Sequence, residues 1–67
     1  MTDKQIGMRL KQYRKDAKLT QVALAQKAGL NSNVVAKVER GLGEPTLATI
    51  KKLSSALGIK ASDLLGY

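Results

Sequence analysis

Apolar residues recur along this chain at intervals of three and four positions, the spacing that gathers side chains on one face of an α-helix. Basic residues fill many of the remaining positions in the first part of the chain. The pattern runs in short stretches separated by turn residues, mostly single glycines, so it predicts several short helices. The predicted inward-facing residues are Ile6, Leu10, Tyr13 and Ala17 in the first helix, Leu24, Ala25 and Ala28 in the second, Val34, Val35 and Val38 in the third, and Leu47, Ile50, Leu53 and Leu57 in the fourth.

Capping residues set the limits of these helices. Thr20, Asn31 and Thr46 each precede a periodic stretch, and their side chains can accept a hydrogen bond from a first-turn backbone N–H. Glycines follow the second, third and fourth stretches, and glycine readily adopts the left-handed conformation that ends many helices. The predicted second helix covers about residues 20–28, the third about residues 32–40, and a short fifth helix about residues 61–65.

The second and third predicted helices are joined by a turn of about three residues that contains Gly29. Two helices joined in this way form the helix-turn-helix arrangement, whose second helix lies in the major groove of DNA. Many all-α bundles also contain two helices separated by a glycine, so the spacing alone is a weak signal and a purely structural pair is the commoner interpretation.

Composition narrows the choice of function. The chain has 67 residues, which predicts one domain over residues 1–67, and it contains no Cys and no His. The usual soft metal ligands and the commonest general base are therefore missing, and we expect neither an enzyme nor a cofactor. Twelve Lys and Arg against five Asp and Glu give a net charge of +7, which suits a polyanionic partner, although a merely soluble basic domain has the same property.

The apolar and aromatic content bears on location and on the kind of nucleic acid. No apolar run approaches the roughly 20 residues that a membrane span needs, and no secretory signal begins the chain, so we expect a cytoplasmic protein. Two Tyr with no Phe or Trp offer few surfaces for stacking unpaired bases. Double-stranded DNA is therefore a better expected partner than a single strand.

Particular residues make the interpretation more specific. They are Ile6-Gly7, Leu10-Lys11-Gln12-Tyr13-Arg14, Leu19-Thr20-Gln21, Leu24-Ala25, Lys27, Gly29-Leu30, Glu39-Arg40-Gly41, Pro45-Thr46-Leu47 and Ala56-Leu57-Gly58-Ile59. With these segments, much of the chain resembles the helix-turn-helix family of phage repressors and Cro proteins, called the XRE family. The resemblance implies a compact five-helix, lambda-repressor-like DNA-binding domain that binds operator DNA, commonly as a symmetric dimer, and regulates transcription.

The resemblance implies that Ser32, Asn33 and Lys37 of the third helix read base edges. A helical wheel places all three on the outer face, together with Ala36 and Arg40. Asn can bond in a bidentate manner to adenine, Ser to several bases and Lys to guanine, whereas Ala36 leaves room for a thymine methyl. The alternative interpretation is that these residues form an ordinary solvent-exposed helix face that does not contact DNA.

Other residues are implied to bind phosphate. At the start of the second helix these are Thr20 and Gln21, where free N–H groups and the helix dipole favour an anion in any case; Gln21 is alternatively just an exposed first-turn residue. Lys51 and Lys52 are interpreted as solvated charge rather than as contacts. The remaining phosphate candidates are Arg14, Arg40, and the backbone N–H groups of Leu47 and Ala48.

Arg14 also matches one half of an ion pair with Glu39 that, in the family, fixes the recognition helix. We interpret this pair as mainly structural, because a partly buried pair sets orientation more than it adds net stability.

The chain departs from the family pattern at several places. Val22 and Ala23 stand where relatives have acidic residues, so some apolar surface is expected there. Lys18 stands where a glycine often ends the first helix in relatives, so the sequence does not predict the conformation of the turn after that helix. Glu44 makes the loop after the third helix less basic than in relatives.

Two further expectations concern partners. A homodimer is inferred from the family, with a hint in the late apolar residues, and no site for a small-molecule effector is evident. A rival interpretation is an antitoxin or adaptor module that acts mainly through a protein partner. The late apolar residues are Leu42, Ile59, Leu64, Leu65 and Tyr67.

Overall fold

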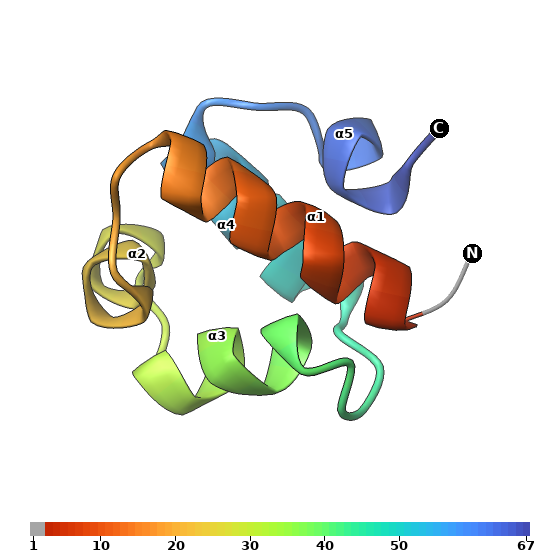
Figure 1. Cartoon of the computed structure of the whole chain (residues 1–67), viewed down its shortest axis with the longest axis horizontal. Helices are drawn as coiled ribbons and strands as arrows, with labels where there is room; N and C mark the ends of the chain where they lie inside the picture. The colour runs from red at the N-terminus through yellow and green to blue at the C-terminus, as the bar shows by residue number, and fades with distance from the viewer. Residues whose placement is uncertain (1–2) are drawn as a thin grey trace.

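The structure, a computed structural model that describes residues 3–67, is all-α, as predicted. Met1 and Thr2, the first residues of the predicted domain, lie outside the described residues. No helix in the described range is long and apolar enough to cross a bilayer. The helices are α1 (Asp3–Asp16), α2 (Gln21–Ala28), α3 (Ser32–Glu39), α4 (Leu47–Leu57) and α5 (Ala61–Leu65) (Figure 1).

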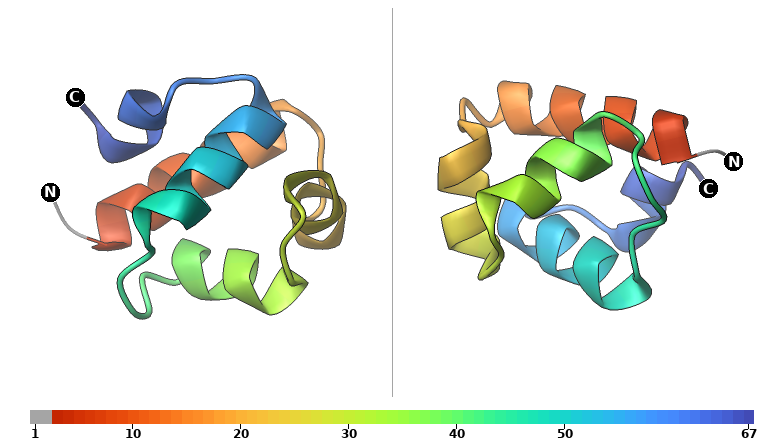
Figure 2. Two further views of the ribbon diagram at one scale, coloured as in Figure 1. Left: turned by 180° about the vertical axis from the view of Figure 1, so that it is seen from behind. Right: turned by 90° about the horizontal axis from the view of Figure 1, so that it is seen from below.

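The helices enclose one core. In the view of Figure 1, α1 crosses in front of α4, α3 lies below them, and α2 closes one side. Seen from behind, α4 comes to the front and α5 lies beside the first part of α1 (Figure 2). Because α3 packs against both α1 and α2, its position is fixed from two directions.

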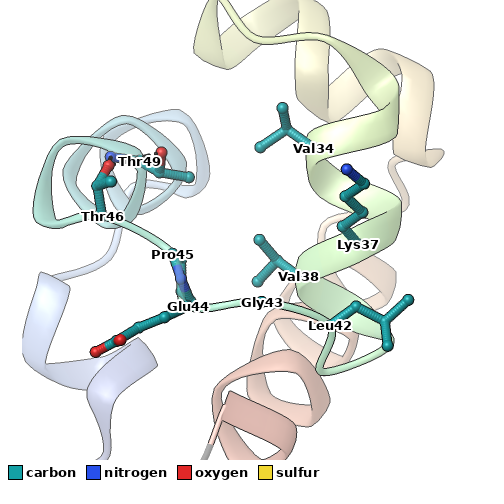
Figure 3. Close-up of a pocket in the computed structure, with 9 residues that line it drawn as sticks. All are labelled: Val34, Lys37, Val38, Leu42, Gly43, Glu44, Pro45, Thr46 and Thr49. Atoms are coloured by element: carbon teal, nitrogen blue, oxygen red, sulfur yellow. Dashed lines mark hydrogen bonds between the residues drawn. The ribbon is translucent and has the colours of Figure 1, made fainter.

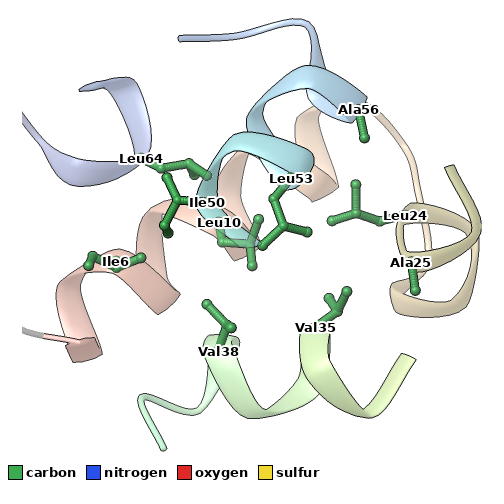
Figure 4. Packing of buried hydrophobic residues seen from close by; sticks show 10 residues of the cluster. All are labelled: Ile6, Leu10, Leu24, Ala25, Val35, Val38, Ile50, Leu53, Ala56 and Leu64. Atoms are coloured by element: carbon green, nitrogen blue, oxygen red, sulfur yellow. The ribbon is translucent and has the colours of Figure 1, made fainter. Parts of the chain in front are cut away.

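All five helices contribute side chains to this core, as Figure 4 shows. Most of the predicted inner residues are in it, while Tyr13, Ala28, Val34 and Leu57 are partly buried against its edge. The buried apolar residues are Ile6, Leu10, Leu24, Ala25, Val35, Val38, Ile50, Leu53, Ala56 and Leu64.

Two predicted inner residues are not in the core. Ala17 is exposed, because α1 ends at Asp16 and the chain is already turning toward α2. The side chain of Leu47 is 60% exposed, because it lies in the first turn of α4, whereas the buried residues of that helix begin at Ile50. The predicted inner position is therefore wrong for Ala17, because the helix does not extend to it. For Leu47 the helical spacing is correct, but the residue is exposed at the helix end.

The turn between α1 and α2 places Lys18 in the left-handed region, with φ of 59°. It is the one non-glycine residue with positive φ in residues 3–67. A side chain with a Cβ atom is strained in this conformation by about 1–2 kcal/mol, whereas glycine is not. The turn that the sequence did not predict therefore has the backbone conformation that glycine adopts readily, although lysine occupies the position.

We expect Lys18→Gly to be more stable than Lys18→Ala by about 1 kcal/mol, because both remove the charge and only alanine keeps the Cβ atom. Urea unfolding followed by circular dichroism measures the difference. An alanine variant as stable as the glycine variant would contradict the proposed strain.

Candidate nucleic-acid interface

The outer face of α3 carries the predicted base-reading residues. Asn33 and Lys37 are exposed, whereas Ser32 and Ala36 are only half-exposed, so the outward face is narrower than the helical wheel indicated. Val35 on the opposite side is completely buried and holds the helix against the core. A polar strip centred on Asn33 and Lys37 is thus presented on a helix that is fixed from behind.

The start of α3 is capped as predicted. The side-chain oxygen of Asn31 accepts a hydrogen bond of 2.8 Å from the backbone N–H of Asn33. This bond uses the backbone of Asn33 and leaves its side-chain amide on the exposed surface. The base-reading candidate therefore lies on an ordered first turn.

The start of α2 presents backbone N–H groups. The Thr20 hydroxyl accepts a hydrogen bond of 3.0 Å from the N–H of Ala23, which confirms the predicted cap. The first N–H groups of a helix have no partner within it, so those of Gln21 and Val22 remain available to an anion. Val22 is 54% exposed, in agreement with the apolar surface expected there.

The side chain of Gln21 takes a direction that the sequence did not indicate. Its amide nitrogen donates a hydrogen bond of 3.1 Å to the Glu39 carboxylate, and the residue is half-buried rather than fully exposed. This arrangement leaves the backbone N–H of Gln21 as its best candidate group for phosphate.

Arg14 and Glu39 form the ion pair that the resemblance implied. The Arg14 Nε atom lies 2.5 Å from one carboxylate oxygen and its Nη2 atom donates to the other at 3.0 Å, while Nη1 donates to the carbonyl oxygen of Leu19 at 2.8 Å. Only 11% of the Arg14 side chain and 4% of the Glu39 side chain are exposed. The hydrogen bond to Glu39 raises the pKa of Arg14 despite its burial, so the guanidinium stays charged.

This cluster joins three parts of the fold at the carboxylate of Glu39, which receives donors from α1 and α2 while it belongs to α3. Because the Arg14 guanidinium is engaged on both sides and almost covered, the geometry supports its structural role and gives no support to the predicted phosphate contact.

The start of α4 resembles the start of α2. The Thr46 hydroxyl accepts a hydrogen bond of 3.2 Å from the N–H of Thr49 and shares another of 3.0 Å with the Thr49 hydroxyl. The N–H groups of Leu47 and Ala48 precede the first intrahelical bond and are therefore the free donors of this helix end. The backbone N–H groups of Leu47 and Ala48, which were predicted from the sequence to bind phosphate, can thus donate hydrogen bonds to an anion at this helix end.

Arg40 ends α3. Its backbone N–H closes the last turn with a bond of 3.1 Å to Ala36, and its side chain is exposed. Gly41 follows with φ of 72°, and a Cβ atom there would lie 3.0 Å from the Cα atom of Lys4. The end of α3 is therefore packed against the start of α1, while the Arg40 side chain is exposed.

A shallow hollow separates α3 from the start of α4 (Figure 3). Its volume is about 240 Å³, and it lies between the predicted base-reading helix and the amides of Leu47 and Ala48. Sequence reasoning did not identify it, because it depends on how the loop at Glu44 and Pro45 folds back. The lining residues are Val34, Lys37, Val38, Leu42, Gly43, Glu44, Pro45, Thr46 and Thr49.

Taken together, the polar outer face of α3, the short turn from α2, and the two capped helix starts define a helix-turn-helix domain. The chain belongs to the helix-turn-helix family, whose model matches residues 10–64. The sequence resemblance and the five-helix fold are thereby confirmed.

Individual relatives agree with this assignment. The chain is 44% identical over 61 residues to the immunity repressor protein of Bacillus phage phi105, covering 91% of this chain and 42% of that protein. Its fold matches the restriction-modification controller protein C.AhdI of Aeromonas hydrophila, with a TM-score of 0.90, 37% identity, and coverage of 92% and 94%. It also matches the biofilm regulator SinR in a complex with DNA, with a TM-score of 0.86, 36% identity, and coverage of 90% and 97%.

These matches are with regulators rather than with enzymes, in agreement with the prediction from composition. The chain spans about half the length of the curated relatives that it matches first.

Proposed function

We propose that this chain is a sequence-specific domain that binds double-stranded DNA and represses transcription, with α3 in the major groove. One observation carries the proposal: the exposed side chains of Asn33 and Lys37 lie on a helix flanked by two helix starts with unused N–H groups. Such N–H groups suit phosphates on either side of a groove, while side chains between them reach the base edges.

The roles within the surface follow from chemistry. Asn33 and Lys37 are the principal base readers, with Ser32 and Ala36 close to the bases at the edge of the strip. The backbone N–H groups of α2 and α4 anchor phosphates, together with the exposed Arg40 side chain. The proposed location is the cytoplasm.

A symmetric homodimer on a palindromic operator is part of the proposal. Half-sites one helical turn apart have centres separated by about 34 Å. The domain measures 26 × 21 × 20 Å, so two copies fit on adjacent half-sites without overlap. Leu42 and Tyr67, with 54% and 82% of their surfaces exposed, offer apolar area for contact between copies.

Selection of bound duplexes from a random pool, repeated at two salt concentrations, tests this function. We expect a palindromic consensus and an affinity that falls steeply with salt, because phosphate neutralisation dominates binding. Selection without any consensus would contradict sequence-specific binding. A mass measurement at micromolar concentration that finds a monomer both free and on the selected duplex would exclude the symmetric dimer.

We expect Asn33→Ala to lose about 1–3 kcal/mol of discrimination at one base pair while the other positions of the consensus keep their preference. Competition with single-base operator variants measures this loss. Gln12→Ala is the matched control, because it removes an exposed amide from α1. If Asn33→Ala ranked every operator variant as the parent does, Asn33 would not read a base.

A further inference from the structure

Three lysines from distant parts of the sequence line a second hollow, of about 420 Å³, between α2 and α4. Lys27 comes from the last turn of α2, and Lys51 and Lys52 come from the middle of α4. Small residues form the remainder of the lining, so the lysine side chains stand around a shallow depression. These small residues are Ala28, Ser55 and Ala56.

No carboxylate of these two helices balances the three charges. Neither α2 nor α4 contains an acidic residue, and the salt bridge found within residues 3–67 joins Arg14 to Glu39 elsewhere. Cations held near one another without acidic neighbours create a local positive potential that attracts a polyanion.

The hollow borders the proposed DNA surface at two places. Ala28 is the last residue of α2, immediately before the turn into α3. Lys51 and Lys52 follow the free amides of Leu47 and Ala48 by one helical turn, and side chains on a helix lean toward its N-terminus. In the left view of Figure 2, α4 is in front, α3 lies below it, and α2 lies at one side of both.

We propose that Lys27, Lys51 and Lys52 bind backbone phosphates of DNA that lie outside the segment read by α3. The inference rests on the proposed function and extends its footprint to the α2–α4 side of the domain. On α4 alone, Lys51 and Lys52 are interpreted as solvated charge. Lys27 lines the same hollow from α2, so the three lysines together form one basic surface. Continuity with the α3 surface favours DNA over an acidic protein segment as the occupant. Because these contacts are to phosphate, they add affinity without adding sequence preference.

The test compares the salt dependence of binding for the parent and the triple variant Lys27→Gln, Lys51→Gln, Lys52→Gln on one fluorescein-labelled duplex from the selection. Each lost phosphate contact lowers the slope of log K against log salt by about 0.9, so we expect a reduction of about 2–3. Base preference should stay unchanged, and the triple Lys→Arg variant should restore the parent slope.

The matched control is Lys11→Gln, Lys15→Gln, Lys60→Gln, which removes the same charge from exposed positions on α1 and before α5. Equal slopes for the two triple variants would overturn the inference. A failure of the parent itself to bind duplex DNA would instead overturn the proposed function. If the α2–α4 variant kept the parent slope but lost binding of polyglutamate that the parent retains, the occupant would be an acidic protein segment rather than DNA.

Discussion

Gly7→Ala is expected to destabilise the domain by about 2–3 kcal/mol, although alanine normally favours a helix over glycine by about 1 kcal/mol. A Cβ atom on Gly7 would lie 2.3 Å from the carbonyl oxygen of Val38 and 2.8 Å from that of Glu39. Both atoms belong to the backbone and cannot move like the end of a flexible side chain. The substitution must therefore push α1 away from the end of α3.

The size of this effect matters because the domain is small. At about 0.05–0.15 kcal/mol per residue, such a chain has about 3–10 kcal/mol of net stability. Separation of α1 from α3 also loosens the packing of Val38 in the core. We therefore expect Gly7→Ala to remove a large part of the net stability of the chain.

Urea unfolding of variants at two neighbouring positions isolates the steric cause. At Met8, which is 62% exposed on the same helix, alanine should be more stable than glycine by about 1 kcal/mol. At position 7 the order should be reversed. The same order at both positions would show that the close approach of α1 to α3 does not limit stability.

The helix limits were predictable because the signals that set them are local. Thr20, Asn31 and Thr46 each bond to an N–H group two or three residues further along the chain, so the bond can be inferred from a short segment. The glycines after α2 and α4 act at the helix end itself. These signals, together with the apolar spacing, were enough to predict five helices in the correct order.

Features that depend on distant segments were not predictable in the same way. The spacing of Leu47 is correct for an inner position, yet exposure depends on whether another element covers the first turn of α4. Gly7 was recognised only as part of a family pattern, because its role depends on backbone atoms of α3.

The same limit applies to the candidate site. Exposure of Asn33 and Lys37 could be predicted, since it follows from the wheel of one helix. The bond from Gln21 to Glu39 joins residues 18 positions apart, and periodicity contains no information about it. Lys27 lines the same hollow as Lys51 and Lys52 because α2 packs against α4, and the spacing of residues along the chain does not indicate this packing either.

Glu39→Ala is expected to cost about 3 kcal/mol or more, because it leaves the nearly buried Arg14 guanidinium without its carboxylate. Gln21 loses its bonding partner in the same substitution. A small gain offsets part of this cost, since an acidic residue at the end of α3 interacts unfavourably with the helix dipole. Thermal and urea unfolding measure the net loss.

The double variant Arg14→Met, Glu39→Leu tests the cause of this loss of stability. It distinguishes the cost of an unpaired buried charge on Arg14 from the loss of the attraction between Arg14 and Glu39. Replacing a buried pair by apolar residues of similar volume is often neutral, so we expect the double variant to regain most of the stability that Glu39→Ala loses. If orientation of α3 is the main role of the pair, the refolded double variant should still bind operator DNA less selectively than the parent. A double variant as unstable as Glu39→Ala would show that the attraction itself holds α1 to α3, whereas full stability with full selectivity would show that core packing alone orients the recognition helix.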